Sequence, residues 1–267
     1  MASLEQSKES RNILITGGSS GIGIELVRLF YHDGFNVWFT YRSGKSQAAA
    51  LVEELRSPAS SATLTALKWD AADRQSLEKL AAALPERLDV LINNAGVGTA
   101  TVKKLSDDPY EQDRFMMMVN AVAPLWLVRK VLPGMKKHGG RIINISSVGG
   151  GITQFPNFTT ADGMSKAALA FMSRQLSAEL TQDPVDVFAI CPGAVETPMF
   201  SASTLDHLDA EERRQLIRNL PGGRLIEPLE IARIARFLCT PAGSVLRGAV
   251  LDASLGLGSN PGQLQAK

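Results

Sequence analysis

Short apolar runs of strand length alternate with longer segments of helical spacing along most of the chain. Runs rich in β-branched and aromatic residues predict strands, and they lie at 12–16, 36–41, 64–69, 90–93, 141–146, 185–190 and 249–252. Apolar residues three and four positions apart predict helices, at 25–32, 47–56, 74–84, 114–137, 165–180 and 229–238. This alternation predicts an α/β fold: a doubly wound, Rossmann-like parallel sheet in a single domain.

The composition of the chain is that of an ordinary globular protein. Its 267 residues are 45% hydrophobic and 21% charged with a net charge of +1, so no nucleic-acid partner is expected. No apolar run reaches the length of a membrane span and the polar start lacks a signal-sequence core, which predicts a cytoplasmic protein without a membrane partner. Residues 1–11 are expected to be a flexible tail and residues 12–267 one domain. Two cysteines make no disulfide framework, and no metal site is expected.

A glycine-rich segment, Thr16-Gly17-Gly18-Ser19-Ser20-Gly21-Ile22-Gly23, lies between the first predicted strand and the first predicted helix. Glycines let the backbone turn sharply and approach a pyrophosphate closely. The start of the helix then offers free N–H groups and the positive end of its dipole. A plain glycine-rich turn is the simpler interpretation of such a pattern taken alone. The strand before it and the helix after it favour a dinucleotide site.

Four further motifs follow along the chain: Asn93-Asn94-Ala95-Gly96, then Asn120, then residues 142–147, and then Pro192-Gly193. Together with the glycine segment, and in this order and spacing, they resemble the short-chain dehydrogenase/reductase family over about residues 12–256. The resemblance implies an oxidoreductase that binds a nicotinamide cofactor on a Rossmann-like sheet.

The resemblance also implies which residues contact the cofactor. The phosphates are expected to be held by Gly17, Ser20, Gly21, Ile22 and Gly23. The adenosine-ribose side is expected to be lined by Asn93, Ala95 and Gly96, and the nicotinamide amide to be held by Pro192, Gly193, Val195 and Thr197. Asp70, which follows a predicted strand, resembles the family's adenine contact. A turn residue or a helix cap is the alternative interpretation of Asp70.

The end of the second predicted strand indicates which nicotinamide cofactor is bound. An acidic residue there would bind both ribose hydroxyls and repel a 2′-phosphate. The chain has Arg42 and Ser43 instead, and an arginine forms charge-assisted hydrogen bonds with a phosphate. NADPH/NADP+ is therefore expected rather than NADH. A solvated surface arginine is the alternative interpretation of Arg42.

The family uses an asparagine, a serine, a tyrosine and a lysine for catalysis, and three of these have counterparts here. Asn120 matches the asparagine, and Lys166 matches the lysine that holds the nicotinamide ribose. Ser147 matches the serine because the strand at 141–146 delivers it to the carboxyl edge, with Ser146 as its backbone neighbour. The tyrosine belongs four residues before the lysine, where this chain has Asp162. All three tyrosines of the chain lie far upstream, and the stretch from Ser147 to Asp162 is about two residues longer than the family's spacing.

An aspartate in place of the tyrosine changes the expected chemistry. A phenol donates a proton as hydride reaches a carbonyl carbon, whereas a carboxylate beside Lys166 is expected to have a lowered pKa and to repel a developing alkoxide. A carboxylate suits a cation, and family members from alkaloid pathways that carry an aspartate here act on iminium substrates. The expected activity is reduction of an imine, an iminium or a conjugated carbonyl in secondary metabolism.

Two other interpretations stay open. If burial raises the pKa of Asp162 strongly, its carboxyl becomes an acid and the protein a ketone reductase. If the chemistry is lost, the protein is an NADPH-binding pseudo-dehydrogenase with a regulatory or scaffold role. The presence of Asn120, Ser147 and Lys166 favours retained redox chemistry.

The segment at 199–222 resembles the mobile substrate lid of the family, and a small organic molecule is the expected substrate. The charged run at 211–214 is expected to be the solvated face of a helix. The resemblance implies a homodimer or homotetramer packed through the helices predicted at 114–137 and 165–180. Met116-Met117-Met118 are expected in the core or in that contact, because methionine fills irregular gaps.

Overall fold

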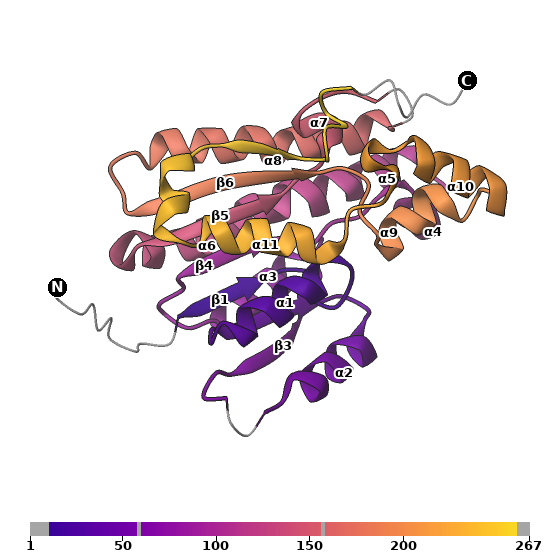
Figure 1. Ribbon diagram of the computed structural model, residues 1–267. Coiled ribbons are helices and arrows are strands. Elements are labelled where there is room, and N and C mark those ends of the chain that lie inside the picture. Colours follow the sequence, from indigo (N-terminus) through magenta and orange to yellow (C-terminus); the bar gives the residue numbers. More distant parts are fainter. Residues whose placement is uncertain (1–10, 58–59, 156–157, 261–267) are drawn as a thin grey trace.

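The computed structural model describes residues 11–57, 60–155 and 158–260, so the tail expected at residues 1–11 falls almost wholly outside the described residues. The described chain holds one seven-stranded parallel sheet in the order β3-β2-β1-β4-β5-β6-β7 (Figure 1). Its strands are β1 (Asn12–Ile15), β2 (Asn36–Tyr41), β3 (Leu64–Lys68), β4 (Val90–Asn93), β5 (Gly140–Ile145), β6 (Val185–Pro192) and β7 (Val250–Ala253). All predicted strands are present, and the doubly wound, Rossmann-like fold is confirmed.

Helices connect the strands and cover the sheet (Figure 1). The α-helices are α1 (Ile22–His32), α2 (Lys45–Leu55), α3 (Arg74–Ala82), α4 (Thr99–Leu105), α5 (Pro109–Met117), α6 (Ala123–His138), α7 (Val148–Gly151), α8 (Thr160–Glu179), α9 (Pro198–Phe200), α10 (Ala210–Asn219) and α11 (Pro228–Leu238). Short π and 3-10 turns are η1 (Met118–Val122), η2 (Ser201–Leu205), η3 (Pro221–Gly223) and η4 (Pro241–Leu246). The segment expected to be a lid forms α9, η2, α10 and η3.

The two faces of the sheet carry separate apolar cores. Successive side chains of a strand point to opposite faces, so Ile13 and Ile15 lie in one core and Leu14 in the other. The first core also contains buried side chains of α1, α2 and α11, and the second those of α3, α6 and α8. A sheet buried on both faces explains why its strands are continuous apolar runs.

Helix α8 begins at Thr160, earlier than the predicted start at 165. The side chain of Thr159 caps it, because its Oγ1 accepts a hydrogen bond from the backbone N–H of Asp162 at 3.4 Å. A threonine at this position satisfies an N–H group that has no partner within the helix. Asp162 therefore lies inside the first turn of α8 and not in a loop before it.

The helix predicted at 114–137 is part of a longer, irregular one. Helix α5, the π turn η1 and helix α6 form a continuous run of 30 residues, Pro109–His138. By length and composition this run could cross a membrane, contrary to the expectation that no segment is long enough. In this fold Leu127, Val128 and Met135 of the run are fully buried in the core beneath the sheet. The run is thus a core helix of the domain.

The strand order changes direction between β1 and β4, and this switch point places the site. Strand β1 pairs in parallel with β2 on one side and with β4 on the other. The glycine segment follows β1 and Asn93 ends β4, at the carboxyl edge of the sheet. The parallel strands all end at this edge, so it also holds the residues that follow the other strands: Arg42 after β2, Asp70 after β3, Ser147 after β5 and Gly193 near the end of β6. Ligands of doubly wound sheets bind in the crevice outside such a switch point.

Candidate active site

The glycine segment after β1 makes a turn that requires glycine at two positions. Gly17 and Gly21 have φ angles of +68° and +52°, which residues with a Cβ atom rarely adopt. A Cβ atom at Gly23 would lie 2.1 Å from the Gly17 carbonyl oxygen, so α1 packs directly on the loop. No side chain caps the start of α1. The positive end of this helix is therefore available to an anion such as a pyrophosphate.

Thr16 and Asn94 hold this loop against the end of β4. The Thr16 Oγ1 atom accepts hydrogen bonds from the N–H groups of Asn94 at 3.0 Å and Ala95 at 2.9 Å. The Asn94 Nδ2 atom donates to the carbonyl oxygens of Thr16 at 2.9 Å and Gly17 at 3.1 Å. Neither residue was predicted as part of the site. Their presence within the two motifs was the only sequence signal for this positioning role.

Asn93 and Asp70, both predicted cofactor contacts, use their side chains within the protein. Asn93 is buried, and its Nδ2 atom donates to Asn144 Oδ1 at 2.8 Å while its own Oδ1 has no partner. Its side chain faces the interior, which leaves only its backbone to meet a cofactor. Asp70 accepts a hydrogen bond at Oδ1 from the N–H group of Ala72 at 3.0 Å. This is the turn role that the sequence left open for Asp70.

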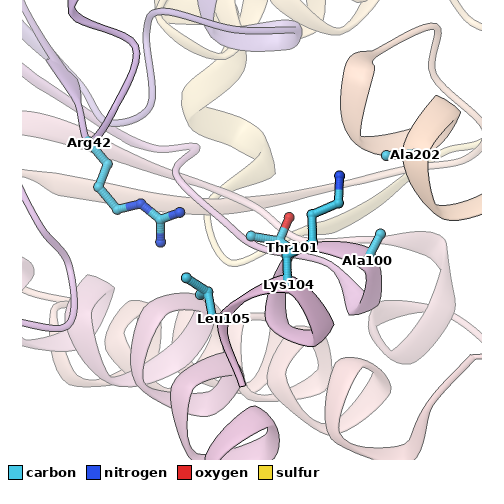
Figure 2. Close-up of a pocket in the computed structure, with 6 residues that line it drawn as sticks. All are labelled: Arg42, Ala100, Thr101, Lys104, Leu105 and Ala202. Atoms are coloured by element: carbon cyan, nitrogen blue, oxygen red, sulfur yellow. The ribbon is translucent and has the colours of Figure 1, made fainter. Parts of the chain in front are cut away.

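Arg42 and helix α4 lie on opposite sides of a cavity of about 160 Å³ (Figure 2). The guanidinium carbon of Arg42 lies 5.7 Å from the centre of the Phe115 ring, a cation–π contact that orients the side chain. Ser43 beside it is exposed. Within the described residues the guanidinium has no carboxylate partner. A guanidinium without a carboxylate partner can bind a phosphate, and a 2′-phosphate at Arg42 stays a prediction.

The segment after β6 is brought onto the glycine loop. Thr197 caps α9, accepting a hydrogen bond from the N–H group of Phe200 at 3.2 Å. A Cβ atom at Gly21 would lie 3.0 Å from the Thr197 methyl carbon. Val195 is buried and forms an isolated parallel β-bridge with Ile226. Ser254 packs directly against Gly193, where a side chain would collide with it. Together with Pro192 at the end of β6, the predicted nicotinamide segment therefore faces the predicted phosphate loop.

Asn120 lies in the π turn η1, which interrupts the long helix. Its Oδ1 atom accepts a hydrogen bond from the N–H group of Val97 at 2.8 Å, and its Nδ2 atom donates to the Val97 carbonyl oxygen at 2.9 Å. Nδ2 also donates to the Ser165 hydroxyl at 3.0 Å. A π turn inside an α-helix frequently marks a functional site. Here Asn120 joins the segment after β4 to α8.

Lys166, on α8, lies beside Asn120 and the end of the Asn-Asn-Ala-Gly motif. A Cβ atom at Gly96 would lie 3.4 Å from Lys166 Nζ and 3.3 Å from Asn120 Oδ1. Burial lowers the pKa of Lys166, and the negative charge of Asp162 acts against that shift. The predicted asparagine, lysine and aspartate are thus gathered at one place at the crevice.

Asp162 lies one helical turn before Lys166, so the two side chains project from the same face of α8. Burial raises the pKa of the Asp162 carboxyl, and the attraction of Lys166 offsets only part of that shift. The sequence-based expectation of a lowered pKa is therefore wrong, because desolvation outweighs the neighbouring charge. Among the described residues, nothing donates a hydrogen bond to the carboxylate or forms an ion pair with it. Asp162 is thus a partly desolvated carboxyl group with no hydrogen-bond or ion-pair partner in the described chain.

Ser147 and Ser146 have different roles at the end of β5. The Ser147 Oγ atom accepts a hydrogen bond from the N–H group of Gly149 at 3.2 Å, and its hydroxyl proton finds no acceptor among the described residues. It is available to a ligand. Ser146 is buried, and its hydroxyl donates to the Lys166 carbonyl oxygen at 2.8 Å. Ser146, expected only as a backbone neighbour, thus ties β5 to α8.

Apolar side chains stand beside these polar groups. The Phe158 ring lies against the loop after Ser147, since a Cβ atom at Gly149 would lie 2.9 Å from it. A Cβ atom at Gly98 would likewise lie 3.5 Å from the side chain of Met199, which belongs to α9. Both side chains remain partly exposed, Phe158 at 39% and Met199 at 44%. They give the site an apolar border.

Comparison with known proteins identifies the class of this fold and site. The family model for short chain dehydrogenases matches residues 11–207. The oxidoreductase UcpA of Salmonella typhimurium is 35% identical over 246 residues, covering 89% of this chain and 90% of that protein. A putative ketoacyl reductase of Streptomyces coelicolor is 30% identical over 269 residues, covering 95% and 99%. The chain belongs to the short-chain dehydrogenase family.

Solved structures agree with this assignment. A variant of actinorhodin polyketide ketoreductase, solved with NADPH, superposes with a TM-score of 0.81 at 30% identity and covers 93% of this chain and 97% of its own. The RhlG/NADP active-site complex of Pseudomonas aeruginosa gives a TM-score of 0.81 at 29% identity, covering 94% and 98%. The predicted family, fold and oxidoreductase class are confirmed, and these relatives agree with the predicted cofactor.

Proposed function

We propose that this chain is an NADPH-dependent reductase that acts on a cationic C=N bond, with Asp162 holding the positive charge of the substrate. The observation that carries the proposal is the Asp162 carboxyl, which has no hydrogen-bond or ion-pair partner among the described residues. The sequence resemblance matches this position to the family's tyrosine. A partly desolvated carboxylate is a poorly stabilised anion. A bound cation would supply the partner that the protein does not.

The residues of the crevice fit NADPH. Gly17 and Gly21 adopt positive φ angles in a loop that an uncapped helix follows, which suits a pyrophosphate. Arg42 is free for a 2′-phosphate, and Lys166 would hold the nicotinamide ribose. The cofactor, when bound, supplies a hydride. The two solved relatives with NADPH and NADP support this choice of cofactor.

The charge of Asp162 favours an iminium over a ketone. When hydride reaches an iminium carbon, a C–H bond forms and the C=N π electrons become the nitrogen lone pair. The cation is neutralised and no proton is needed at that moment. A ketone becomes an alkoxide instead, which needs a proton and is repelled by a carboxylate. Asp162 stabilises the first substrate and opposes the second, while the Ser147 hydroxyl can donate a hydrogen bond to the oxygen of a ketone.

A second function, ketone reduction with Asp162 as the acid, is favoured by one observation. Burial raises the pKa of the Asp162 carboxyl, so a larger fraction carries a proton than in an exposed aspartate. The two functions predict opposite pH profiles. Ketone reduction would fall as the pH rises through the pKa of Asp162, whereas reduction of a permanently charged iminium would rise.

The apolar border of the site supports a substrate with an apolar body. Phe158 and Met199 keep part of their surface exposed at the crevice, and apolar side chains at a pocket contact apolar parts of a ligand. A small cyclic iminium of the kind made in secondary metabolism has both features: a largely apolar ring system and the cationic C=N bond that Asp162 would bind.

The test is NADPH oxidation by the wild type and by Asp162→Asn and Asp162→Glu, with an N-alkylated cyclic iminium, a ketone and an enone. The proposal expects iminium turnover that falls about a hundredfold in Asp162→Asn and is largely kept in Asp162→Glu, which retains the charge. NADPH affinity should be the same in all three. Undiminished iminium turnover in Asp162→Asn would contradict the proposal. Tight NADPH binding without turnover of any substrate would assign a regulatory, non-catalytic role.

A further inference from the structure

We infer that Lys104, on helix α4, is a second binding residue for the 2′-phosphate of NADPH and that it acts with Arg42, which lines the same cavity. The inference rests on the proposed NADPH-dependent function and extends it to a residue outside every motif that the sequence shows. It assigns the cofactor specificity of this chain to two cations from separate parts of the fold.

The charged residues that line the cavity are both cations. Its lining residues are Arg42, Ala100, Thr101, Lys104, Leu105 and Ala202. In Figure 2, Arg42 lies on one side, while Thr101 and Lys104 of α4 lie on the other. Among the described residues, no carboxylate lines the cavity. Its volume of about 160 Å³ far exceeds the roughly 10–15 Å³ that one water molecule needs, so a phosphate group has room there.

The two cations form no ion pair in the part of the chain that the structure describes. Arg28, Arg114 and Lys130, by contrast, all form ion pairs with glutamates. Two like charges facing one space repel each other. A 2′-phosphate carries between one and two negative charges at neutral pH. Bound between the two cations, it would attract both and offset their repulsion. It would accept a bidentate contact from Arg42 and a point-charge contact from Lys104.

The arrangement is specific to one of two adjacent lysines. Lys103 and Lys104 are both exposed in the last turn of α4, where a positive charge interacts favourably with the helix dipole. That general role is shared by both residues. Only Lys104 lines the cavity with Arg42. Lys103 is therefore a matched control for the loss of a lysine at this helix end.

The test measures dissociation constants of NADPH and NADH at fixed ionic strength for the wild type, Lys104→Ala and Lys103→Ala. Lys104→Ala should weaken NADPH binding about tenfold, as expected for loss of one charge-assisted hydrogen bond, and leave NADH binding unchanged. Lys103→Ala should keep both constants within about twofold of the wild type, because an exposed charge contributes little. Thermal unfolding of each variant checks that the fold is retained, and Lys104→Gln replaces Lys104→Ala if it is not.

The outcomes separate this inference from the proposed function. Equal effects of Lys104→Ala and Lys103→Ala on NADPH binding, or equal losses for NADPH and NADH in Lys104→Ala, would overturn the role of Lys104. A wild type that prefers NADPH would leave the proposed cofactor standing in both cases. A wild type that binds NADH as tightly as NADPH would overturn the proposed cofactor itself, and the inference with it.

Discussion

The Nδ2 atom of Asn120 donates a hydrogen bond to the hydroxyl oxygen of Ser165 at 3.0 Å. That hydroxyl in turn donates to the carbonyl oxygen of Asp162 at 2.8 Å, and Ser165 is fully buried. The π turn in the long helix is thereby connected to the first turn of α8. The position of Asp162 depends on a serine that lies outside the four positions at which the family has its catalytic residues.

Ser165→Ala should lower the free energy of unfolding by about 1 kcal/mol, the net contribution of a buried hydrogen bond, and should reduce kcat because the start of α8 is less firmly held. Ser177→Ala is the control. Ser177 is also buried on α8, and no hydrogen bond of its side chain is found in the described chain. Urea unfolding and steady-state turnover give the two readouts. Equal effects of the two substitutions would show that the link through Ser165 does not matter.

Asp162→Asn should stabilise the protein at neutral pH. Burial raises the pKa of this carboxyl in the folded state, so the folded state binds the proton more tightly than the unfolded one. The ionised group therefore destabilises the fold above its folded pKa, and this penalty disappears below the unfolded value of about 3.9. The melting temperature of Asp162→Asn should exceed that of the wild type at pH 7 and approach it toward pH 4.

The exposed carboxylate of Asp107 provides the comparison, because Asp107→Asn removes a charge in open solvent. Thermal unfolding of both variants between pH 4 and 8 should show a pH-dependent gain only for Asp162→Asn. A gain of the same size at both ends of the range would mean that the substitution acts through packing and not through charge.

How far the sequence predicts this fold depends on local apolar patterns. Strands β2 and β4 match their predicted bounds, 36–41 and 90–93, because each is a continuous apolar run between turn residues. Helix α4 was not predicted, since Val102 is its only buried residue and no apolar stripe develops over seven residues. Helix α10 buries no residue at all, and the sequence predicted only its charged run at 211–214, as the solvated face of a helix.

The residues of the candidate site were likewise predicted only where a local sequence pattern marks them. Asn120, Ser147 and Lys166 were predicted from motif spacing, which needs no knowledge of the folded chain. The hydrogen bond from Asn120 to Ser165 joins residues 45 positions apart, and only the folded chain brings them together. The direction of the Asp162 pKa shift was predicted wrongly because it is a balance between burial and the charge of Lys166. The sequence contains the charge but not the depth of burial.

Lys166→Ala should weaken NADPH binding and abolish turnover. In the proposed function Lys166 holds the nicotinamide ribose and also balances the charge of Asp162 within the crevice. Arg174→Ala is the control, because Arg174 is an exposed cation on the same helix. NADPH titration and turnover should separate the two variants clearly. Full affinity and activity in Lys166→Ala would mean that the Asp162–Lys166 segment is wrongly matched to the family.

Self-association should depend on the outer face of α8. The predicted dimer or tetramer would pack through the long helix and α8, and these carry exposed Trp126 and Phe171, at 46% and 62%. Large apolar side chains on a surface frequently mark an interface. Phe171→Ser should shift the assembly to a smaller species in light scattering, whereas Phe237→Ser, on α11, should not. A monomeric wild type would contradict the predicted assembly.

Asp162→Tyr should convert the protein into a weak ketone reductase. By the sequence match to the family, the substitution would restore the set of four catalytic residues, and a phenol near Lys166 is a suitable proton donor for a developing alkoxide. The same change removes the negative charge that the proposed function assigns to iminium binding, so iminium turnover should fall about a hundredfold. The decisive control is Asp162→Phe, which has nearly the same size without the hydroxyl. Ketone turnover in Asp162→Tyr and none in Asp162→Phe would assign the gain to proton donation. Equal ketone turnover in both would show that Asp162 blocks the reaction through its charge alone and that another group supplies the proton.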